Sequence, residues 1–131
     1  MKSYIPKTKD DINAINELQK YSFLEIQEDV KILLEWMQDM HWDVAIGIVK
    51  YFKNYIIEIE KEIIEILNSN DEEWKYNVLH FLIKDFQEKK LPKKLKEEIQ
   101  RMAFSPNLSE IEEELDILSK EILQFTAGEQ K

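Results

Sequence analysis

Apolar residues recur along much of the chain at steps of three and four, the spacing of one face of an α-helix. The clearest such pattern predicts a single helix from Ser22 to Asp39. Ser22 and Glu25 stand at its start with the spacing of a capping box, in which each side chain accepts from a backbone amide of the other residue. The stripe consists of Phe23, Ile26, Val30, Leu33, Leu34 and Met37.

Two further segments, 42–52 and 71–86, are apolar on nearly all sides, which predicts helices buried between neighbours. Gly47 lies inside the first of them, where glycine costs about 1 kcal/mol relative to alanine. A close approach by another helix would compensate for this cost. Between the two segments, residues 54–68 have apolar residues on one side and charged residues elsewhere, which predicts an amphipathic, half-exposed helix.

Serine and glutamate three positions apart predict two more helix starts, at Ser69 with Glu72 and at Ser109 with Glu112. The second of these precedes the last predicted helix, and residues 126–131 are expected to fray. The apolar stripe of that last helix is Leu108, Ile111, Leu115, Leu118, Ile122 and Phe125.

Two tryptophans, Trp42 and Trp74, stand 32 residues apart, and an aspartate precedes each of them by three positions, Asp39 and Asp71. A period of this length carried by helices is typical of stacked helix pairs. We therefore expect an all-α fold, a short HEAT- or armadillo-like superhelix of about six to seven helices, with an irregular helical bundle as the alternative. One helical-repeat domain over residues 1–125 with a tail at 126–131 is the expected organisation.

Composition agrees with helices, because the 131 residues include only 2 glycines and 3 prolines. There is no cysteine, no signal-peptide pattern at the start and no apolar run of the roughly 18 residues that a membrane span requires. The expected location is cytoplasmic, without membrane contact. A net charge of −9 repels nucleic acid and makes a basic protein the natural electrostatic partner, although an acidic surface also serves solubility alone.

Several stretches of the chain form a pattern that extends over most of its length. They are Tyr4-Ile5-Pro6-Lys7, Leu34-Glu35-Trp36-Met37-Gln38-Asp39-Met40-His41-Trp42 with Val44-Ala45, Asn70-Asp71 with Trp74-Lys75-Tyr76, and the glutamate-rich run into Asp116 with Glu121-Ile122-Leu123. Together they resemble a family of small bacterial proteins known as a domain of unknown function with a HEAT-like helical fold. The family pattern has a proline after the second tryptophan, where this chain has Asp43. The resemblance implies the fold but no activity.

Reactive residues do not form a recognisable catalytic set. His80 lies in an apolar helix and is interpreted as a core or boundary residue. Glu35, Asp39 and His41 could gather around a metal ion, but such sites need three or four ligands with a fixed second shell, and no matching set appears elsewhere, so no metal site is expected. The serines lie near helix boundaries, where capping explains them, and a run such as 112–114 is typical of a solvated face. We expect no enzymatic activity and no cofactor.

The most interesting constellation is aromatic and acidic, and it gives the candidate partner-binding residues. Trp36 is notable because it lies off the apolar stripe of its helix. The leading hypothesis is a non-catalytic interaction module that binds another protein, in a specific form an antidote-like inhibitor of a basic protein. The alternative is a small-molecule or peptide binder with an aromatic pocket between the central helices. The candidates are Trp36, Asp39, His41, Trp42, Asp71, Trp74 and Tyr76.

Overall fold

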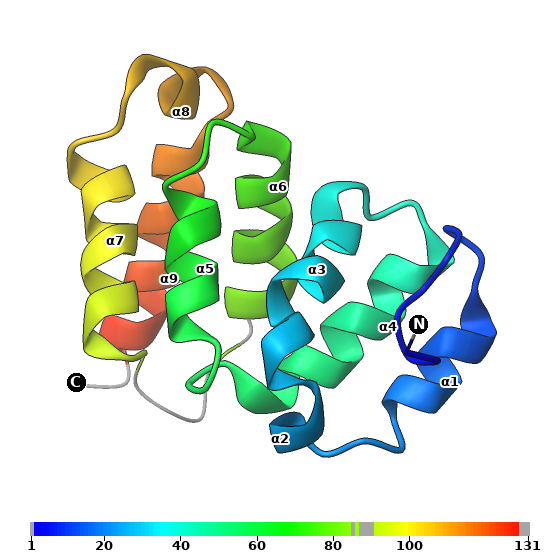
Figure 1. Ribbon diagram of the computed structural model, residues 1–131. Coiled ribbons are helices and arrows are strands. Elements are labelled where there is room, and N and C mark those ends of the chain that lie inside the picture. Colours follow the sequence, from blue (N-terminus) through cyan, green and yellow to red (C-terminus); the bar gives the residue numbers. More distant parts are fainter. Residues whose placement is uncertain (1, 85, 87–90, 129–131) are drawn as a thin grey trace. The chain divides into compact units, whose positions relative to one another are not determined.

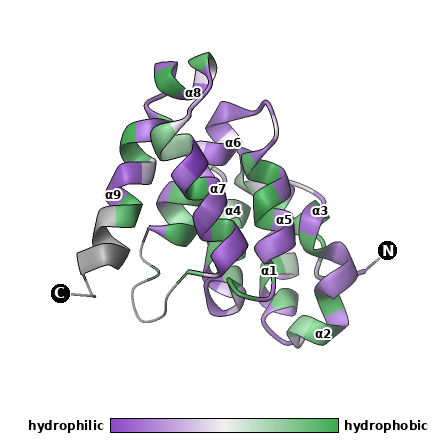
Figure 2. Cartoon of the chain, turned by 90° about the vertical axis from the view of Figure 1, so that its left-hand side faces the viewer, coloured by the Kyte–Doolittle hydropathy of each residue, from purple (hydrophilic) through white to green (hydrophobic). Residues whose placement is uncertain are grey.

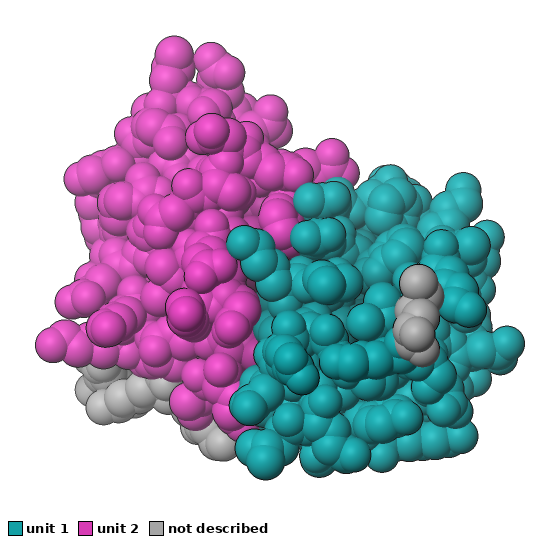
Figure 3. All heavy atoms as spheres, viewed as in Figure 1, with its two compact units in different colours: residues 1–55 teal, residues 56–131 magenta. Residues whose placement is uncertain are grey.

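The computed structural model describes residues 2–84, 86 and 91–128 of the 131, with side chains for residues 2–84, 86 and 91–123. The regular elements of these residues are all helical, which confirms the all-α class. The chain divides into two compact units, residues 1–55 (unit 1) and 56–131 (unit 2), which Figure 3 colours separately. A single domain over 1–125 and a HEAT-like superhelix stay predictions.

Unit 1 is built around one apolar helix, α4, as its sequence predicts. Buried residues occupy almost the whole circumference of α4, and only positions such as Ile46 reach the surface. The elements of unit 1 are α1 (Ile12–Leu18), α2 (Phe23–Ile26), η1 (Gln27–Asp29), α3 (Val30–Leu34), η2 (Glu35–Gln38), α4 (Asp43–Phe52) and η3 (Lys53–Tyr55), in which η1, η2 and η3 are 3₁₀ turns (Figure 1).

The glycine inside α4 marks a close approach of α1. A Cβ atom placed on Gly47 would lie 2.4 Å from Cγ2 of Ile15, closer than real atoms come. The expected close approach at Gly47 is therefore confirmed, and the absence of a side chain is what permits it.

The single helix predicted from Ser22 to Asp39 is wrong. This stretch consists of α2, η1, α3 and η2, short α and 3₁₀ segments in succession. The predicted stripe is nevertheless buried from Ile26 onward, at Ile26, Val30, Leu33, Leu34 and Met37. At the start of α2, the Glu25 carboxylate accepts from the backbone amide of Ser22 at 2.9 Å, as the capping box predicts.

Unit 2 is a group of packed helices in which α7 contacts both α5 and α9 (Figure 1, green to red). The predicted helix 54–68 begins later than expected, since α5 starts at Glu60, and the helix predicted over 71–86 changes from α to π geometry at Val78. The elements are α5 (Glu60–Leu67), α6 (Glu72–Asn77), the π-helical η4 (Val78–Ile83), α7 (Lys93–Phe104), α8 (Leu108–Glu112) and α9 (Leu115–Gly128).

The last predicted helix is interrupted between α8 and α9. Glu114 stands at this break with a φ of 58°, in the left-handed region. Leu108 is 71% exposed, so the predicted apolar stripe is wrong over α8, which carries hydrophobic residues to the surface (Figure 2). Leu115, Leu118 and Ile122 of α9 are buried as predicted. The side chain of Phe125 lies outside the described residues, and fraying of 126–131 stays a prediction.

Aspartate and asparagine, rather than the predicted serines, cap α6 and α8 of unit 2. Asp71 accepts from the amide of Trp74 at 3.0 Å, whereas the hydroxyl of Ser69 donates to a carbonyl of the preceding helix, α5. Asn107 caps α8 in place of Ser109. The two tryptophans of the 32-residue period also differ locally, because Trp42 is the residue before α4 and Trp74 lies inside α6.

A buried charge network, Lys75–Glu110–Arg101, fixes α8 in unit 2. Glu110 is 0% exposed and Lys75 2%, and their side chains meet at 3.1 Å. Arg101 of α7 donates two hydrogen bonds to the same carboxylate, at 3.0 and 2.7 Å. Burial alone would raise the pKa of Glu110, but the bonds from Arg101, the Asn107 amide and Lys75 lower it to about 2. Helix α8 is thus tied to both α6 and α7.

Candidate functional site

An open concavity of about 330 Å³ lies in unit 2 between the α6–η4 helix and the segment that joins α8 to α9. We call it the acidic concavity, since four of its lining residues are glutamates. Its walls are Tyr76, His80 and Lys84 on one side and Glu112, Glu113, Glu114, Ile117, Leu118 and Glu121 on the other.

The α6–η4 wall contains a stacked pair of aromatic rings. The rings of Tyr76 and His80 stack with their centroids 5.3 Å apart and their planes at 10°, and Tyr76 is 39% exposed. Lys84 follows one turn later, with its amide bonded to the carbonyl of Leu79 at 2.9 Å, a bond that spans five residues. The π-helical geometry of η4 sets the position of these side chains around the helix.

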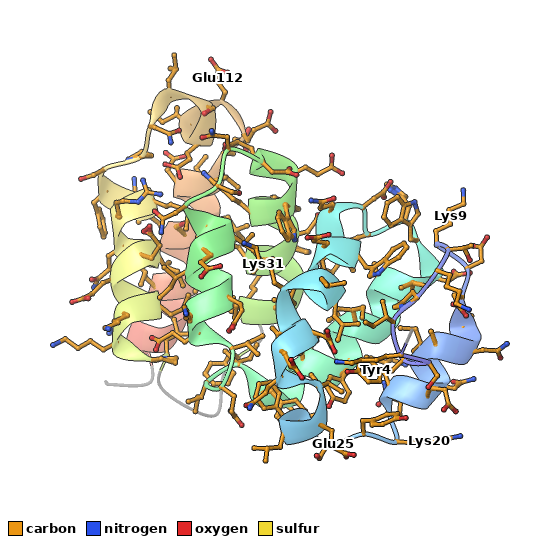
Figure 4. All side chains as sticks on the ribbon, viewed as in Figure 1. Tyr4, Lys9, Lys20, Glu25, Lys31 and Glu112 are labelled. Carbon is orange, nitrogen blue, oxygen red and sulfur yellow. The ribbon has the colours of Figure 1, made fainter. Side chains whose placement is uncertain are left out.

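The opposite wall is a run of carboxylates. Glu112 ends α8 (Figure 4), Glu113 and Glu114 form the break before α9, and all three side chains are exposed. Glu121, two turns into α9, lies 3.5 Å from the ammonium group of Lys84. One cation of this chain therefore already faces one carboxylate of the concavity, and the other three glutamates give it a strongly negative potential.

A second open concavity, of about 250 Å³, lies in unit 1, and we call it the tryptophan corner. Trp36 of η2 and Trp42, the residue before α4, meet edge to face with centroids 5.6 Å apart and planes at 68°. Both rings are half-buried. The corner is lined by Ile5, Pro6, Ile32, Glu35, Trp36, Gln38 and Trp42.

The N-terminal segment that supplies Ile5 and Pro6 to this corner is held by a buried carboxylate. The hydroxyl of Tyr4, labelled in Figure 4, donates to Asp29 of η1, and the Lys2 ammonium group donates to the same oxygen at 2.8 Å. Burial alone would raise the pKa of Asp29, but these two bonds lower it. Burial and the same carboxylate raise the pKa of Tyr4.

The structure brings four of the predicted site residues close together in unit 1. Trp36 and Trp42 share the tryptophan corner, and the turn between them contains Asp39 and His41. The carboxylate of Asp39 accepts from the amide of His41 at 2.9 Å and lies 3.0 Å from its Nδ1 atom. The amide bond is the larger cause that lowers the pKa of Asp39, and the ring bond is the second. The His41 side chain is 95% exposed, so this pair is a surface turn.

The other three predicted residues, Asp71, Trp74 and Tyr76, belong to α6 and its cap in unit 2. Asp71 caps the helix, and Trp74 is buried, at 8% exposure. Tyr76 lines the acidic concavity, and Asp71 and Trp74 do not. The aromatic pocket expected between the central helices combines residues of both units and stays a prediction.

Sequence reasoning missed most of the acidic concavity. His80 is half-buried, as expected of a boundary residue, and the glutamates at 112–114 are exposed, as expected of a solvated face, but the sequence does not reveal that they line the same hollow. One signal was present: Tyr76, His80 and Lys84 recur at steps of four, which places polar groups on one face of a helix that otherwise reads as apolar.

The described residues contain neither a metal-binding cluster nor a membrane-spanning helix. Among them, no group of three or more histidine, aspartate or glutamate side chains is arranged to hold a metal ion. None of the helices in the described ranges is long and apolar enough to cross a bilayer.

Fold and concavities together define an all-α protein with small, open hollows, one acidic and one aromatic. The chain belongs to the family of the Domain of unknown function (DUF5071), whose model matches residues 4–123. The expected resemblance to a domain-of-unknown-function family over most of the chain is thereby confirmed, whereas the HEAT-like fold attached to it stays a prediction. No curated protein matches the chain in sequence.

Proposed function

We propose that this protein is a non-catalytic interaction module that binds a basic protein through the acidic concavity of unit 2. The observation that carries the proposal is the pairing of four glutamates with the stacked rings of Tyr76 and His80 around one hollow. Carboxylates attract a cationic side chain, and an exposed aromatic face gives that side chain a surface to pack on.

The charge of the chain is concentrated in this unit. Residues 56–131 contain 18 acidic and 11 basic residues, against 9 acidic and 7 basic residues in 1–55. Most of the net charge of −9 thus belongs to unit 2. A field of this sign accelerates association with a basic surface and makes that association sensitive to salt.

Arginine suits the concavity better than lysine. A guanidinium group is planar, so it stacks on rings such as those of Tyr76 and His80, and its forked donors match a carboxylate in pairs. Glu112, Glu113 and Glu114, which line the concavity beside the Lys84–Glu121 pair, supply such carboxylates.

The proposal includes the finer expectations of the sequence. A HEAT-like stacking of helix pairs is supported by the neighbouring helices α5, α7 and α9, and stacked helices commonly present binding surfaces. A bacterial, cytoplasmic setting is supported by the family resemblance and by the absence of cysteine. An antidote-like inhibitor of a basic protein is the specific role that charge and size support.

The test uses a fluorescein-labelled peptide of alternating arginine and glycine, with binding followed by fluorescence anisotropy at low and high salt. We expect saturable binding that weakens roughly tenfold when sodium chloride rises from about 50 to about 300 mM. Glu112→Gln with Glu113→Gln should weaken binding by about three- to tenfold, since two carboxylates of the concavity lose their charge.

The matched control is Glu58→Gln with Glu97→Gln, two exposed glutamates of unit 2 outside the concavity. It removes the same charge and should leave the affinity within about twofold. If both double variants weaken binding equally, the interaction depends on the net charge of unit 2 alone, and the acidic concavity is not the binding site. Equal binding of a citrulline–glycine peptide, which is neutral, would contradict it altogether.

A further inference from the structure

The tryptophan corner of unit 1 has no role in the proposed binding of a basic protein by unit 2. The tryptophan corner is open and apolar on most sides, and Glu35 is its one ionisable lining residue. Ile32 is 47% exposed beside the two half-buried indoles. Large apolar side chains left in contact with water around a hollow commonly mark a ligand site.

The geometry of the indoles selects the ligand. The two rings meet edge to face, with centroids 5.6 Å apart and planes at 68°, and both line the hollow, so a group seated there can contact both. The face of an indole carries negative charge density, so it attracts a cation within about 6 Å of the ring centroid. A cation in this corner can be attracted by both rings at once.

The lining residues other than the two tryptophans limit which kind of cation fits the corner. A primary ammonium group needs acceptors for three N–H bonds. Ile5, Pro6 and Ile32 offer only apolar side chains, which leaves the Glu35 carboxylate and the Gln38 carbonyl as the side-chain acceptors of the lining. An alkylated ammonium group has few N–H bonds or none, and its methyl groups lose little when they leave water. Glu35 then supplies the opposite charge without the need for a hydrogen bond.

The backbone around the corner holds these walls in place. Ile5 and Pro6 follow Tyr4, whose buried side chain is bonded to Asp29, and the Ile5 amide donates to the carbonyl of Lys2 at 3.2 Å. Trp36 follows Glu35 in the 3₁₀ turn η2, so carboxylate and ring come from one short segment. A site held by packed neighbours needs less ordering when a ligand arrives.

We propose that the tryptophan corner binds an alkylated ammonium group, such as the head group of choline or a trimethylated lysine side chain. The two indoles supply the cation–π surface, Glu35 the countercharge, and the residues of the N-terminal segment and α3 the apolar walls.

The test titrates the full-length protein with choline chloride and, separately, with 3,3-dimethyl-1-butanol, the neutral molecule in which carbon replaces the nitrogen. Binding is followed through the indole N–H signals in proton–nitrogen NMR spectra. We expect saturable shifts of the Trp36 and Trp42 signals, with choline bound about tenfold more tightly than its neutral counterpart. Equal affinities would overturn the proposal, because they would show an apolar hollow without cation recognition, and so would an absence of saturable shifts.

Variants locate the site. Trp36→Leu should abolish choline binding, and Glu35→Gln should weaken it by about three- to tenfold. Glu28→Gln removes an exposed carboxylate of unit 1 that does not line the corner, and its affinity should stay within about twofold. Because Trp36→Leu also changes packing, the surface variant Glu35→Gln decides the matter if Trp36→Leu fails to fold. Unchanged affinity in Glu35→Gln would overturn the assignment of Glu35 as the countercharge.

A second titration separates the two sources of the ligand. The probes are a short peptide with one trimethylated lysine and the same peptide with unmodified lysine. Tighter binding of the methylated peptide than of choline supports the proposal with a protein as the source, and binding of choline alone supports it with a free metabolite. Binding of the unmodified peptide as tight as that of the methylated one would overturn the selectivity for alkylated ammonium.

Discussion

Unit 1 and unit 2 each bury a carboxylate, and the partners of the two carboxylates differ. Asp29 in unit 1 accepts from a neutral hydroxyl, Tyr4, and from Lys2, whose side chain is 45% exposed. Glu110 in unit 2 accepts from Lys75, which is itself buried, and from Arg101. Unit 1 therefore keeps its cation in water, whereas unit 2 places both charges of an ion pair in the interior.

This difference determines what happens when one partner is removed. A buried charge that loses its partner keeps its full cost of leaving water, while an exposed cation that loses its partner is still solvated. Unit 2 should therefore be much more sensitive than unit 1 to changes in its buried polar groups. The same network positions α8 and hence the glutamates of the acidic concavity.

Glu110→Ala should produce the largest effect. Among the described residues, the substitution leaves the buried Lys75 ammonium group with Glu72, whose carboxylate oxygen lies 3.3 Å away. It also removes the carboxylate that accepts from the Asn107 amide at the start of α8. Breaking a buried pair in this way costs about 3 to 5 kcal/mol. Urea unfolding followed by circular dichroism gives the free energy of unfolding.

Glu112→Ala is the control for this prediction, because it removes an exposed glutamate from the same helix. It should change the free energy of unfolding by no more than about 0.5 kcal/mol. If both variants change it by the same amount, the network does not hold unit 2 together.

Acid should weaken unit 2 through the same carboxylate. The pKa of Glu110 lies near 4.5 in the unfolded chain and at about 2 in the folded protein, so the folded state favours the charged form. Its contribution is complete above pH 4.5 and is lost as the pH falls toward 2. Urea titrations across this range should show a shallower loss of stability in Glu110→Gln than in the parent protein. Parallel losses in the two proteins would contradict the assignment.

The apolar packing of unit 1 gives a prediction of intermediate size. Gly47→Ala gains about 1 kcal/mol of helix propensity, but the new methyl group overlaps Cγ2 of Ile15 at 2.4 Å. Overpacking of this kind costs about 1 to 3 kcal/mol, so the net effect should be destabilising. In an Ile15→Ala background the overlap is absent, and Gly47→Ala should then be neutral or stabilising. A stabilising effect in the parent protein would refute the close packing of α1 on α4.

Tyr4→Phe tests the carboxylate of unit 1. Asp29 loses one donor but keeps Lys2, so the cost should be about 1.5 kcal/mol, below that of Glu110→Ala. The pKa of Asp29 should rise, because one of the bonds that lower it is gone. Tyr51→Phe is the control, since that hydroxyl donates to a neutral carbonyl, Tyr21 O, at 3.0 Å, and it should cost less. A cost for Tyr51→Phe equal to that of Tyr4→Phe would contradict the special role of the charged acceptor.

Buried faces could be predicted from the sequence more reliably than helix ends. The burial of α4 and of Leu115, Leu118 and Ile122 follows from apolar spacing, because any packing must cover those faces. Which residue caps a helix depends on competition between neighbouring side chains for the same backbone groups. The hydroxyl of Ser69 bonds backward to Ile66 and leaves the start of α6 to Asp71, a choice that spacing alone does not reveal.

The candidate sites were also hard to predict where they depend on contacts between residues far apart in the sequence. Trp36 stood out because it lies off its stripe, and it does line a concavity. The role of the glutamates at 112–114 depended on the direction of α8, which is set by Glu110 and Lys75, 35 residues apart in the chain. A contact of that separation leaves no periodic signal, so the run resembled an ordinary solvated face.

Glu114→Gly should have the smallest effect on stability and the opposite sign. Glu114 holds a φ of 58°, a conformation that costs a residue with a side chain roughly 1 kcal/mol and costs glycine almost nothing. Glycine loses part of this gain to the greater entropy of the unfolded chain, so urea unfolding should show a stabilisation below about 1 kcal/mol. The same substitution removes a carboxylate from the acidic concavity and should weaken binding of the arginine peptide. A gain in stability with a loss of binding is expected where a strained residue serves a site. Unchanged peptide affinity would mean that unit 2 carries this strain for another reason.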